Sequence, residues 1–412
     1  MKKDIGSLMH ERGIEALWVR GPSDHNPNMV YFTGLKNMTS PDLFIKDDAS
    51  PVLVCDAMER EEAEKTGLRI INKAKYSLNS FLKQSNGNYL KAVALQYQAI
   101  LQDFGINRGK LAISGRVEFG STFALMNELK QIMPMLEILG FIRDDPLTLA
   151  RMTKDREELA HIQKMGRITT EVVGKVADFL SQQKIHNETL IQSNGQPLTV
   201  GEIKRLIRLW IVERGAEIPE EIIFAFGRDA GIPHSAGQPD DIIRTGIPIV
   251  FDIFPCEAGG GYFYDFTRTW CLGYAPDEVY KVYEEVYSVY KTIITELKCD
   301  IPFNKIQSRT CQLLAQKGHK TIAEEPELEE GYVHSIGHGL GLAVHEKPAS
   351  GIGSDSHDVL KPGVVITIEP GLYYPSRNLG VRIEDTYFAD ESGDFKIMAD
   401  YPYELIIPVK KS

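Results

Sequence analysis

The fold of this chain is decided by three stretches near its C-terminus: Gly337-His338-Gly339-Leu340-Gly341, Ile368-Glu369-Pro370-Gly371 and Arg382-Ile383-Glu384-Asp385. Together with Asp252 and Asp265 they supply one imidazole and four carboxylates as candidate ligands. Four carboxylates gathered in one buried place would be very costly and would take up protons instead. Two divalent cations would neutralise them, so the set predicts a dinuclear metal site of the kind that activates water.

Asp252 and Asp265 lie on two consecutive predicted strands. Residues 247–254 are an apolar run around Asp252, residues 262–272 form the next predicted strand, and the loop between them ends in three glycines. This pattern favours an antiparallel hairpin, which can place both carboxylates on one face. A single aspartate in a strand is more often part of a turn or an ion pair, but two across one hairpin favour a site.

Histidines are concentrated around the first stretch. His338 lies between two glycines, which would leave room for its ring to reach a metal. His334 and His345 flank it, so three of the ten histidines of the chain fall within twelve residues. A Gly-His-Gly triplet alone would be better explained by a flexible turn.

The remaining carboxylates follow apolar runs. Glu369 comes at the end of the run 364–368, where a buried carboxylate needs a partner. Glu384 lies in a predicted strand over residues 381–388, which an exposed edge strand would also explain. Because side chains alternate along a strand, Arg382 and Glu384 should share a face, where the arginine can hold the carboxylate or meet a substrate carbonyl.

The length of 412 residues favours two domains. Residues 1–145 alternate short apolar runs with helical stretches, which predicts an α/β domain with a largely buried sheet. Its expected elements are strands at 16–19, 43–45, 51–55 and 109–114 and a helix at 119–133.

Residues 146–412 form the second expected domain. A helix should begin after Asp155, which with Glu158 has capping-box spacing. A polar loop is expected over 181–199, and further helices are expected at 203–214, 276–297 and 304–317, the last ending before Gly318. Short strands and turns follow, so this domain is predicted to be α+β.

Composition excludes several classes of protein. The net charge of −11 and the pI of about 5.5 argue against binding to nucleic acid or to an anionic membrane. No apolar run is long enough to cross a membrane, and no apolar segment follows the N-terminal lysines as in a signal peptide. The five cysteines are scattered without a Cys-x-x-Cys pair, which indicates reduced thiols in the cytoplasm.

The order of these motifs resembles that of one metallopeptidase family. Asp…Asp-x-Thr-Arg-Thr, Gly-His-Gly-x-Gly, Glu-Pro-Gly and Arg-x-Glu-Asp are similar to the motifs of methionine aminopeptidase, prolidase and aminopeptidase P, which share the pita-bread fold. Residues 27–34 resemble the creatinase/prolidase-type N-terminal domain that accompanies the proline-specific branch. The resemblance implies five metal ligands in this sequence: Asp252, Asp265, His338, Glu369 and Glu384.

Three further residues carry over from the resemblance. His234, before Ser235, and His345, before Glu346, match the two family histidines near the substrate, and Arg382 matches the arginine before the last ligand. The chain departs from the family pattern at Phe254, where a glycine is usual, and in a slightly longer interval between the two aspartates. These differences leave the ligands intact and bear on the shape of the loop.

The resemblance also implies a mechanism. Asp265 and Glu384 would bridge two metals, a hydroxide held between the metals would attack the scissile carbonyl, and Glu369 would transfer protons. Three residues would position the peptide and support its transition state: His234, His345 and Arg382. We expect two divalent ions, manganese first, with cobalt, zinc or iron(II) as alternatives, because imidazole makes a purely calcium site unfavourable.

The expected function is metal-dependent hydrolysis of the X-Pro bond, at peptide N-termini or in dipeptides. The partners would be short peptides with proline at the second position, and the family implies a homodimer. Two alternatives stay open: another enzyme on this fold, such as a creatinase-like hydrolase or a metal-dependent lyase, and a catalytically inactive binding module. The complete ligand set argues against the creatinase-like branch and the inactive module, whereas a lyase could keep the ligands.

Overall fold

The computed structural model describes residues 1–46, 50–351 and 358–410 and separates into two compact units. The first unit holds residues 1–151 with 259–261, and the second holds the rest of the chain. Helix α7 (Pro146–Arg151) therefore belongs to the first unit, although it follows the boundary that we expected after residue 145. No helix within the described ranges is long and apolar enough to cross a membrane.

The first unit is built on a mixed six-stranded sheet of order β4-β3-β2-β1-β5-β6. Pairing is parallel between β1 and β5, β5 and β6, and β3 and β4, and antiparallel between β1 and β2 and between β2 and β3. Its strands are β1 (Ile14–Arg20), β2 (Asp42–Lys46), β3 (Val52–Cys55), β4 (Arg69–Asn72), β5 (Gly109–Gly115) and β6 (Leu136–Leu139).

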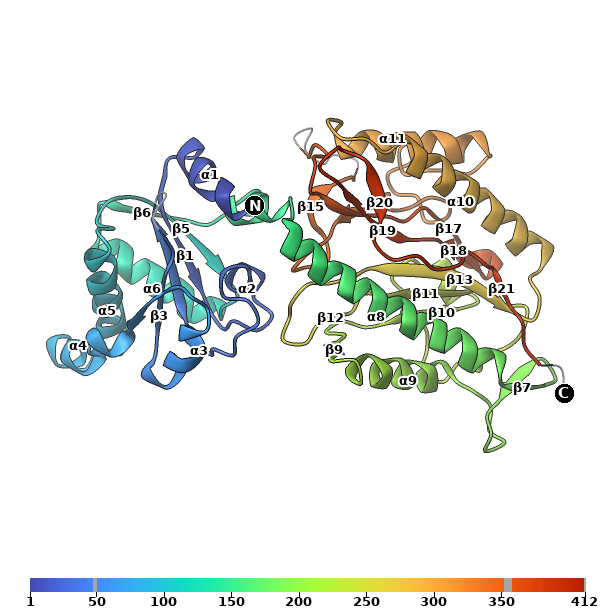
Figure 1. Ribbon diagram of the computed structural model, residues 1–412, viewed down its shortest axis with the longest axis horizontal. Coiled ribbons are helices and arrows are strands. Elements are labelled where there is room, and N and C mark those ends of the chain that lie inside the picture. The colour runs from blue at the N-terminus through green and yellow to red at the C-terminus, as the bar shows by residue number, and fades with distance from the viewer. Residues whose placement is uncertain (47–49, 352–357, 411–412) are drawn as a thin grey trace. The chain divides into compact units, whose positions relative to one another are not determined.

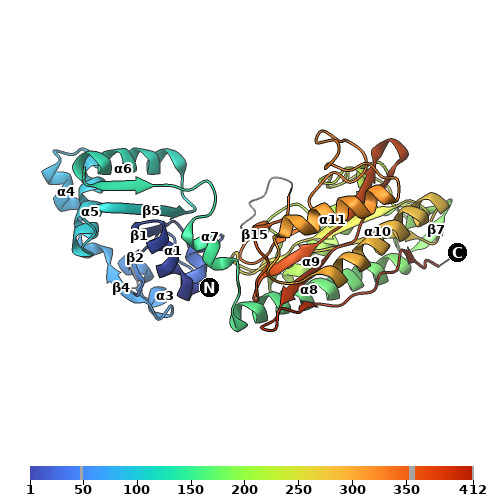
Figure 2. The ribbon, with the colours of Figure 1, turned by 90° about the horizontal axis from the view of Figure 1, so that it is seen from above.

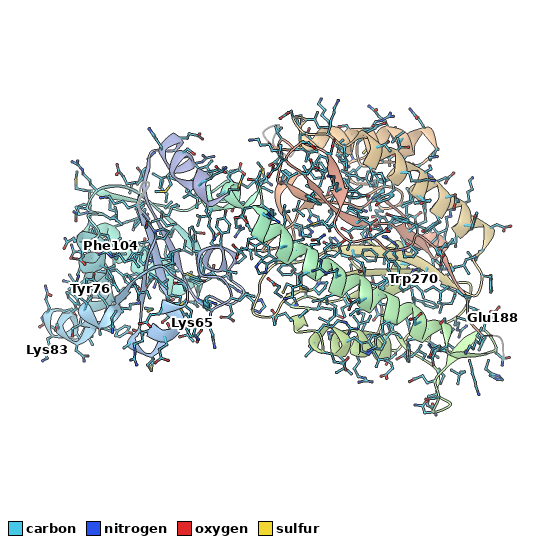
Figure 3. All side chains as sticks on the ribbon, in the orientation of Figure 1. Lys65, Tyr76, Lys83, Phe104, Glu188 and Trp270 are labelled. Atoms are coloured by element: carbon cyan, nitrogen blue, oxygen red, sulfur yellow. The ribbon has the colours of Figure 1, made fainter. Side chains whose placement is uncertain are left out.

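Helices cover both faces of this sheet, with α5 and α6 along one side and α2 on the other (Figure 1). The core between the sheet and α5 and α6 contains Trp18, Tyr97 and Leu129, and Tyr76 and Phe104 join it (Figure 3). The α/β prediction for this domain is confirmed. Its helices are α1 (Ile5–Glu11), α2 (Pro27–Thr33), α3 (Arg60–Glu64), α4 (Leu78–Gln84), α5 (Tyr89–Asp103) and α6 (Phe119–Ile132).

One half of the second unit packs two helices, α8 and α9, on the sheet β10-β11-β13-β21. Trp270, labelled in Figure 3, contributes to this core from β13. The elements are α8 (Arg156–Ser181), β7 (Lys184–His186), β8 (Thr189–Ile191), α9 (Val200–Val212), β9 (Ala216–Glu217), β10 (Ile223–Phe226), β11 (Ile249–Ile253), β12 (Cys256–Glu257), β13 (Phe266–Leu272) and β21 (Ile406–Ile407).

The other half packs α10 and α11, which lie side by side in Figures 1 and 2, against the sheet β15-β14-β16-β19-β20 and the hairpin β17-β18. The second unit is thus α+β, as predicted. The elements are α10 (Asp277–Glu296), α11 (Phe303–Gln316), β14 (His338–Gly339), β15 (Glu346–Ala349), β16 (Val365–Ile368), β17 (Gly371–Tyr374), β18 (Leu379–Arg382), β19 (Asp385–Ala389) and β20 (Phe395–Ile397).

Local signals in the sequence account for several of these elements. Asp155 and Glu158 form the expected capping box, with the Asp155 carboxylate accepting from two backbone N–H groups at the start of α8. Gly318 follows α11 with φ +89°, as its predicted role at the helix end requires. The expected loop at 181–199 instead contains the short hairpin β7-β8, whose three-residue strands are too brief to give a pattern.

Candidate metal centre and active site

One cavity of about 260 Å³ in the second unit brings together all the residues that the sequence singled out. They come from positions more than a hundred residues apart and include every candidate ligand and every candidate substrate contact. The predicted residues in its lining are His234, Asp252, Asp265, His338, His345, Glu369, Arg382 and Glu384. That they hold metal and carry the chemistry stays a prediction at this point, since geometry alone gives only their proximity.

The antiparallel pairing of β11 with β13 positions the two aspartates. Asp252 lies opposite Thr267, and Asp265 precedes Thr267 by two residues, so both carboxylates face the same side of the sheet. The two residues are almost fully buried, at 8% and 4% exposed. The hairpin inferred from the glycine-rich loop therefore has the geometry that the sequence predicted.

Backbone packing, and not room for the imidazole, explains the glycines beside His338. A Cβ on Gly337 would lie 1.9 Å from the backbone oxygen of Thr367, and one on Gly339 would lie 2.0 Å from the backbone oxygen of Lys347. Neither glycine can take a side chain, because backbone oxygens cannot move aside as flexible side chains do. Our explanation from the sequence was therefore wrong, although it pointed to the right residue.

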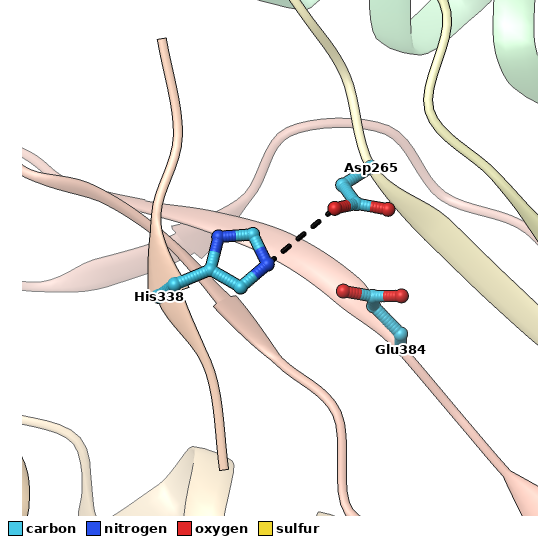
Figure 4. A group of neighbouring side chains, drawn as sticks. All are labelled: Asp265, His338 and Glu384. Atoms are coloured by element: carbon cyan, nitrogen blue, oxygen red, sulfur yellow. Dashed lines mark ion pairs between the residues drawn. The ribbon is translucent and has the colours of Figure 1, made fainter. Parts of the chain in front are cut away.

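The His338 ring is held with one nitrogen facing the carboxylates (Figure 4). Its Nε2 lies 3.5 Å from both Asp265 Oδ2 and Glu369 Oε1. Its Nδ1 lies 3.0 Å from the carbonyl oxygen of Gly339 and 3.3 Å from the backbone nitrogen of His345. Because a carbonyl oxygen can only accept, the shorter contact assigns the proton to Nδ1 and leaves the Nε2 lone pair free for a metal.

Glu384 comes from a break between two strands and not from the continuous strand that we expected over 381–388. The chain leaves the β17-β18 hairpin at Arg382 and enters the larger sheet at Asp385. Between them the backbone N–H of Glu384 donates to Thr267 O at 3.0 Å, and Thr267 Oγ1 donates to Glu384 Oε2 at 2.7 Å. The change of sheet directs this carboxylate into the cavity, where it is 1% exposed.

Glu369 lies directly after β16, and its backbone N–H donates to Ile336 O at 2.8 Å. The Thr367 hydroxyl is 3.3 Å from Glu369 Oε1 and also accepts from the backbone N–H of His338 at 3.1 Å. One threonine thereby fixes the relative position of the histidine and the glutamate.

Arg382 is the only lysine or arginine among the residues that line the cavity, and it is 3% exposed. Its guanidinium donates to Asp252 Oδ2, to Tyr373 OH at 2.9 Å and to Pro233 O at 3.2 Å. Its Nε lies 3.3 Å from Thr267 Oγ1, the same hydroxyl that donates to Glu384. Arg382 thus orients the first aspartate directly and Glu384 through Thr267, and the same-face prediction for Arg382 and Glu384 agrees with this shared contact.

The carboxylates oppose one another electrostatically. Burial, together with the charges of neighbouring carboxylates, raises the pKa of Asp265 and of Glu384 well above the ordinary values. Burial also raises the pKa of Glu369 to about 8, against the opposing charge of Arg382. Burial lowers the pKa of His338 to about 3, so its imidazole is neutral, as a metal ligand must be.

The residues fit a divalent metal centre. One carboxylate oxygen of Asp252 and one of Asp265 are buried and have no hydrogen-bond partner among the described residues. Ligand atoms of Asp265, His338 and Glu384 lie within 4.8 Å of one another. Buried carboxylate oxygens without donors, close to a neutral imidazole nitrogen, are the surroundings that a hard or borderline cation requires.

The two candidate substrate histidines lie on the more exposed part of the cavity. His345 stands in the left-handed region with φ +63°, an uncommon conformation for a residue with a side chain, and such strain is frequent at functional sites. Its ring meets that of His338 edge-on, with centroids 4.4 Å apart. His234 precedes Ser235 in the turn after a short helical segment, and its exposed ring forms part of the cavity wall.

Sequence reasoning missed the residues that connect these groups. The Tyr373 hydroxyl accepts a hydrogen bond from Arg382 and lies 2.9 Å from Nε2 of His334. Thr267 and Thr367 orient the carboxylates. The alternation Asp265-x-Thr267 could have indicated that the threonine shares a face with the ligand. Nothing in the sequence around Tyr373 distinguishes it from a core tyrosine.

Comparisons with known proteins identify the families of the two domains. The model of metallopeptidase family M24 matches residues 160–391, and that of the creatinase/prolidase N-terminal domain matches residues 3–143. The probable dipeptidase PepE of Mycobacterium tuberculosis is 29% identical over 67% of this chain and 67% of its own length. The Xaa-Pro dipeptidase of Pyrococcus furiosus is 24% identical over 95% of this chain and 97% of its own.

Solved structures share the fold. The Xaa-Pro dipeptidase from Bacillus anthracis superposes with a TM-score of 0.75 at 23% identity, over 98% of each chain. The fold is therefore the expected pita-bread domain preceded by the creatinase/prolidase-type domain. The family match identifies the chain as a metal-dependent peptidase. Because the family model spans more than half of the 412 residues and includes every cavity residue identified above, the chain belongs to metallopeptidase family M24.

Proposed function

We propose that this protein hydrolyses the peptide bond between an N-terminal residue and proline, in dipeptides or at the N-termini of short peptides. The observation that carries the proposal is the single cavity in which five metal-type ligands face two histidines and a buried arginine. Its volume of about 260 Å³ lies below the roughly 300–1,000 Å³ of pockets for drug-sized ligands, which suits a small substrate.

Five residues would hold two divalent cations, for which manganese is our first choice: Asp252, Asp265, His338, Glu369 and Glu384. The cations would act as Lewis acids and lower the pKa of water to about 7. The free oxygens of Asp252 and Asp265 and the unprotonated Nε2 of His338 support this assignment. Cobalt, zinc and iron(II) accept the same donors.

The residues around the carboxylates would handle the peptide. Glu369 would take and return the proton, since it would lie beside the water that the cations activate. His345 and His234 would donate to the developing oxyanion or the leaving nitrogen from the more open side of the cavity. Arg382 would keep Asp252 and Glu384 in place through its own contact and through Thr267.

The proline assignment is supported by the relatives that match almost the whole chain and bear the name Xaa-Pro dipeptidase. It is also supported by the first domain, whose family model carries the name of prolidase. A homodimer and a cytoplasmic location remain predictions from the family and from the sequence.

The proposal is tested with metal-free protein reconstituted with manganese. Hydrolysis is compared for Gly-Pro, an X-Pro tripeptide, Gly-Ala and a peptide that begins with Met-Ala. We expect cleavage of one or both proline substrates and little cleavage of the others, and the ratio of the first two separates dipeptidase from aminopeptidase activity. Cleavage of the Met-Ala peptide alone, or of none of the four, would contradict the proposal.

A further inference from the structure

Two glutamates at the rim of the cavity have no part in the proposed chemistry. Glu220 and Glu221 precede β10, in which Ile223 pairs with Asp252 of β11, and both line the cavity beside His345. Adjacent carboxylates at the mouth of a site that already contains four others require an explanation, because each raises the cost of the negative charge there. The two differ sharply in their surroundings.

Glu221 is neutralised by the protein itself. Its Oε1 accepts from Lys204 Nζ at 2.9 Å, and its Oε2 accepts from Arg208 at 2.6 Å. Lys204 is only 4% exposed, so it needs this carboxylate as its partner. Both carboxylate oxygens of Glu221 therefore already accept from cationic side chains of the protein, and this residue has a structural role.

Glu220 has no such partner. It is exposed, and among the described residues no hydrogen bond or ion pair engages its carboxylate. The one arginine of the cavity wall, Arg382, is committed to Asp252, Tyr373 and Pro233. Glu220 shares the wall of the cavity with His345.

Apolar side chains lie in the same cavity as Glu220. Ile223, Ala236, Phe254 and Val344 offer a surface for hydrocarbon, while the unpartnered oxygens of Asp252 and Asp265 mark the buried end. A ligand that is bound at the buried end and extends to the rim would thus meet the unpaired carboxylate of Glu220 next to this apolar surface. A short peptide with a positive charge on its first residue matches that arrangement.

On the basis of the function proposed above, we propose that Glu220 is a specificity residue that binds a positively charged nitrogen of the residue before proline. The nitrogen can come from the α-ammonium group or from a basic side chain, which present the same chemistry to the carboxylate. Glu220 thereby favours substrates with a free amino terminus or a basic first residue, and it contacts substrate without taking part in bond cleavage.

The test compares Glu220→Gln with the wild-type protein, both loaded with manganese, on Ala-Pro, Lys-Pro and norleucine-Pro. Norleucine matches lysine in length but lacks its charge, and propionyl-Pro, tested as a competitive inhibitor, lacks the α-ammonium group. Glu324→Gln serves as the control, because it removes the same charge from an exposed position outside the cavity. Circular dichroism and the melting temperature establish that each variant is folded.

We expect Glu220→Gln to raise KM about fivefold with little change in kcat, the size of an exposed ion pair. If the α-ammonium group is bound, all three dipeptides lose affinity and propionyl-Pro inhibits both proteins equally. If the side chain is bound, Lys-Pro alone loses its advantage over norleucine-Pro. Unchanged KM values for every charged substrate, or an equal change in Glu324→Gln, would overturn the assignment of Glu220. Failure of the wild-type protein to cleave any of the dipeptides or the X-Pro tripeptide would instead refute the proposed function.

Discussion

Replacing Glu369 by glutamine separates the proposed proton-transfer role of this residue from its effect on stability. Glutamine has the same shape, and Thr367 Oγ1, 3.3 Å from Glu369 Oε1, can still donate to its amide oxygen. Loss of a general acid–base group typically lowers the rate about 10²–10⁴-fold, which corresponds to about 3–5 kcal/mol in the activation free energy. We therefore expect kcat of the manganese-loaded variant to fall by at least about a hundredfold.

The same substitution should stabilise the metal-free protein at high pH. The pKa of Glu369 rises from its ordinary 4.5 to about 8 in the folded chain, because burial penalises the ionised form. The folded state therefore holds a proton that the unfolded state has lost, so stability falls as pH rises from about 4.5 to about 8. The loss reaches up to about 5 kcal/mol above pH 8, and glutamine, which does not ionise, avoids it.

The assay measures melting temperatures of the wild-type and Glu369→Gln proteins at pH 5 and pH 9, each in chelator and in excess manganese. In chelator the two should melt together at pH 5, and the variant should melt several degrees higher at pH 9. Manganese should stabilise the wild-type protein more, because the proposed ligand set includes the Glu369 carboxylate. A variant that melts no higher than wild type at pH 9 without metal would refute the electrostatic argument. A kcat within about tenfold of wild type would remove Glu369 from proton transfer.

Three further outcomes are expected. Asp42→Asn should destabilise the first unit by about 3 kcal/mol in urea unfolding, because Arg20 and Lys73 lose a buried carboxylate. These cations hold the pKa of Asp42 below its ordinary 3.8, so its contribution is present above about pH 4 and is lost on further acidification. Gly337→Ala should abolish metal uptake measured by calorimetry, because its Cβ would lie 1.9 Å from Thr367 O. Chelation at pH 7.5 should abolish peptide hydrolysis and lower the melting temperature, both reversed by added manganese.

The sequence predicted those features that depend on local patterns. The capping box at Asp155, the apolar run around Asp252 and the glycine-rich hairpin loop each report on a few neighbouring residues, and the structure has the corresponding elements. The prediction of one continuous strand over residues 381–388 was wrong. The chain changes from one sheet to another at Glu384, and the alternation of side chains along a strand does not indicate such a change. The role of Tyr373 was invisible for a related reason, since it depends on Arg382 arriving from the neighbouring strand.

The position of the cavity follows from the way in which the second unit is divided into two cores. One core joins α8 and α9 to β11 and β13, and the other joins α10 and α11 to β16, β18 and β19. Asp252 and Asp265 come from the first half, whereas His338, Glu369 and Glu384 come from the second. Neither half alone contributes enough of the proposed ligands for two cations. The mutual repulsion of the carboxylates opposes bringing the two halves together when no cation is bound. Arg268 holds the two halves together despite this repulsion. It is 0% exposed and donates to Glu384 O and to the Asp385 carboxylate, both at 2.9 Å. Arg268 thus joins the two halves through the Glu384 backbone and Asp385, and it leaves the carboxylate oxygens of the cavity for the cations that we propose.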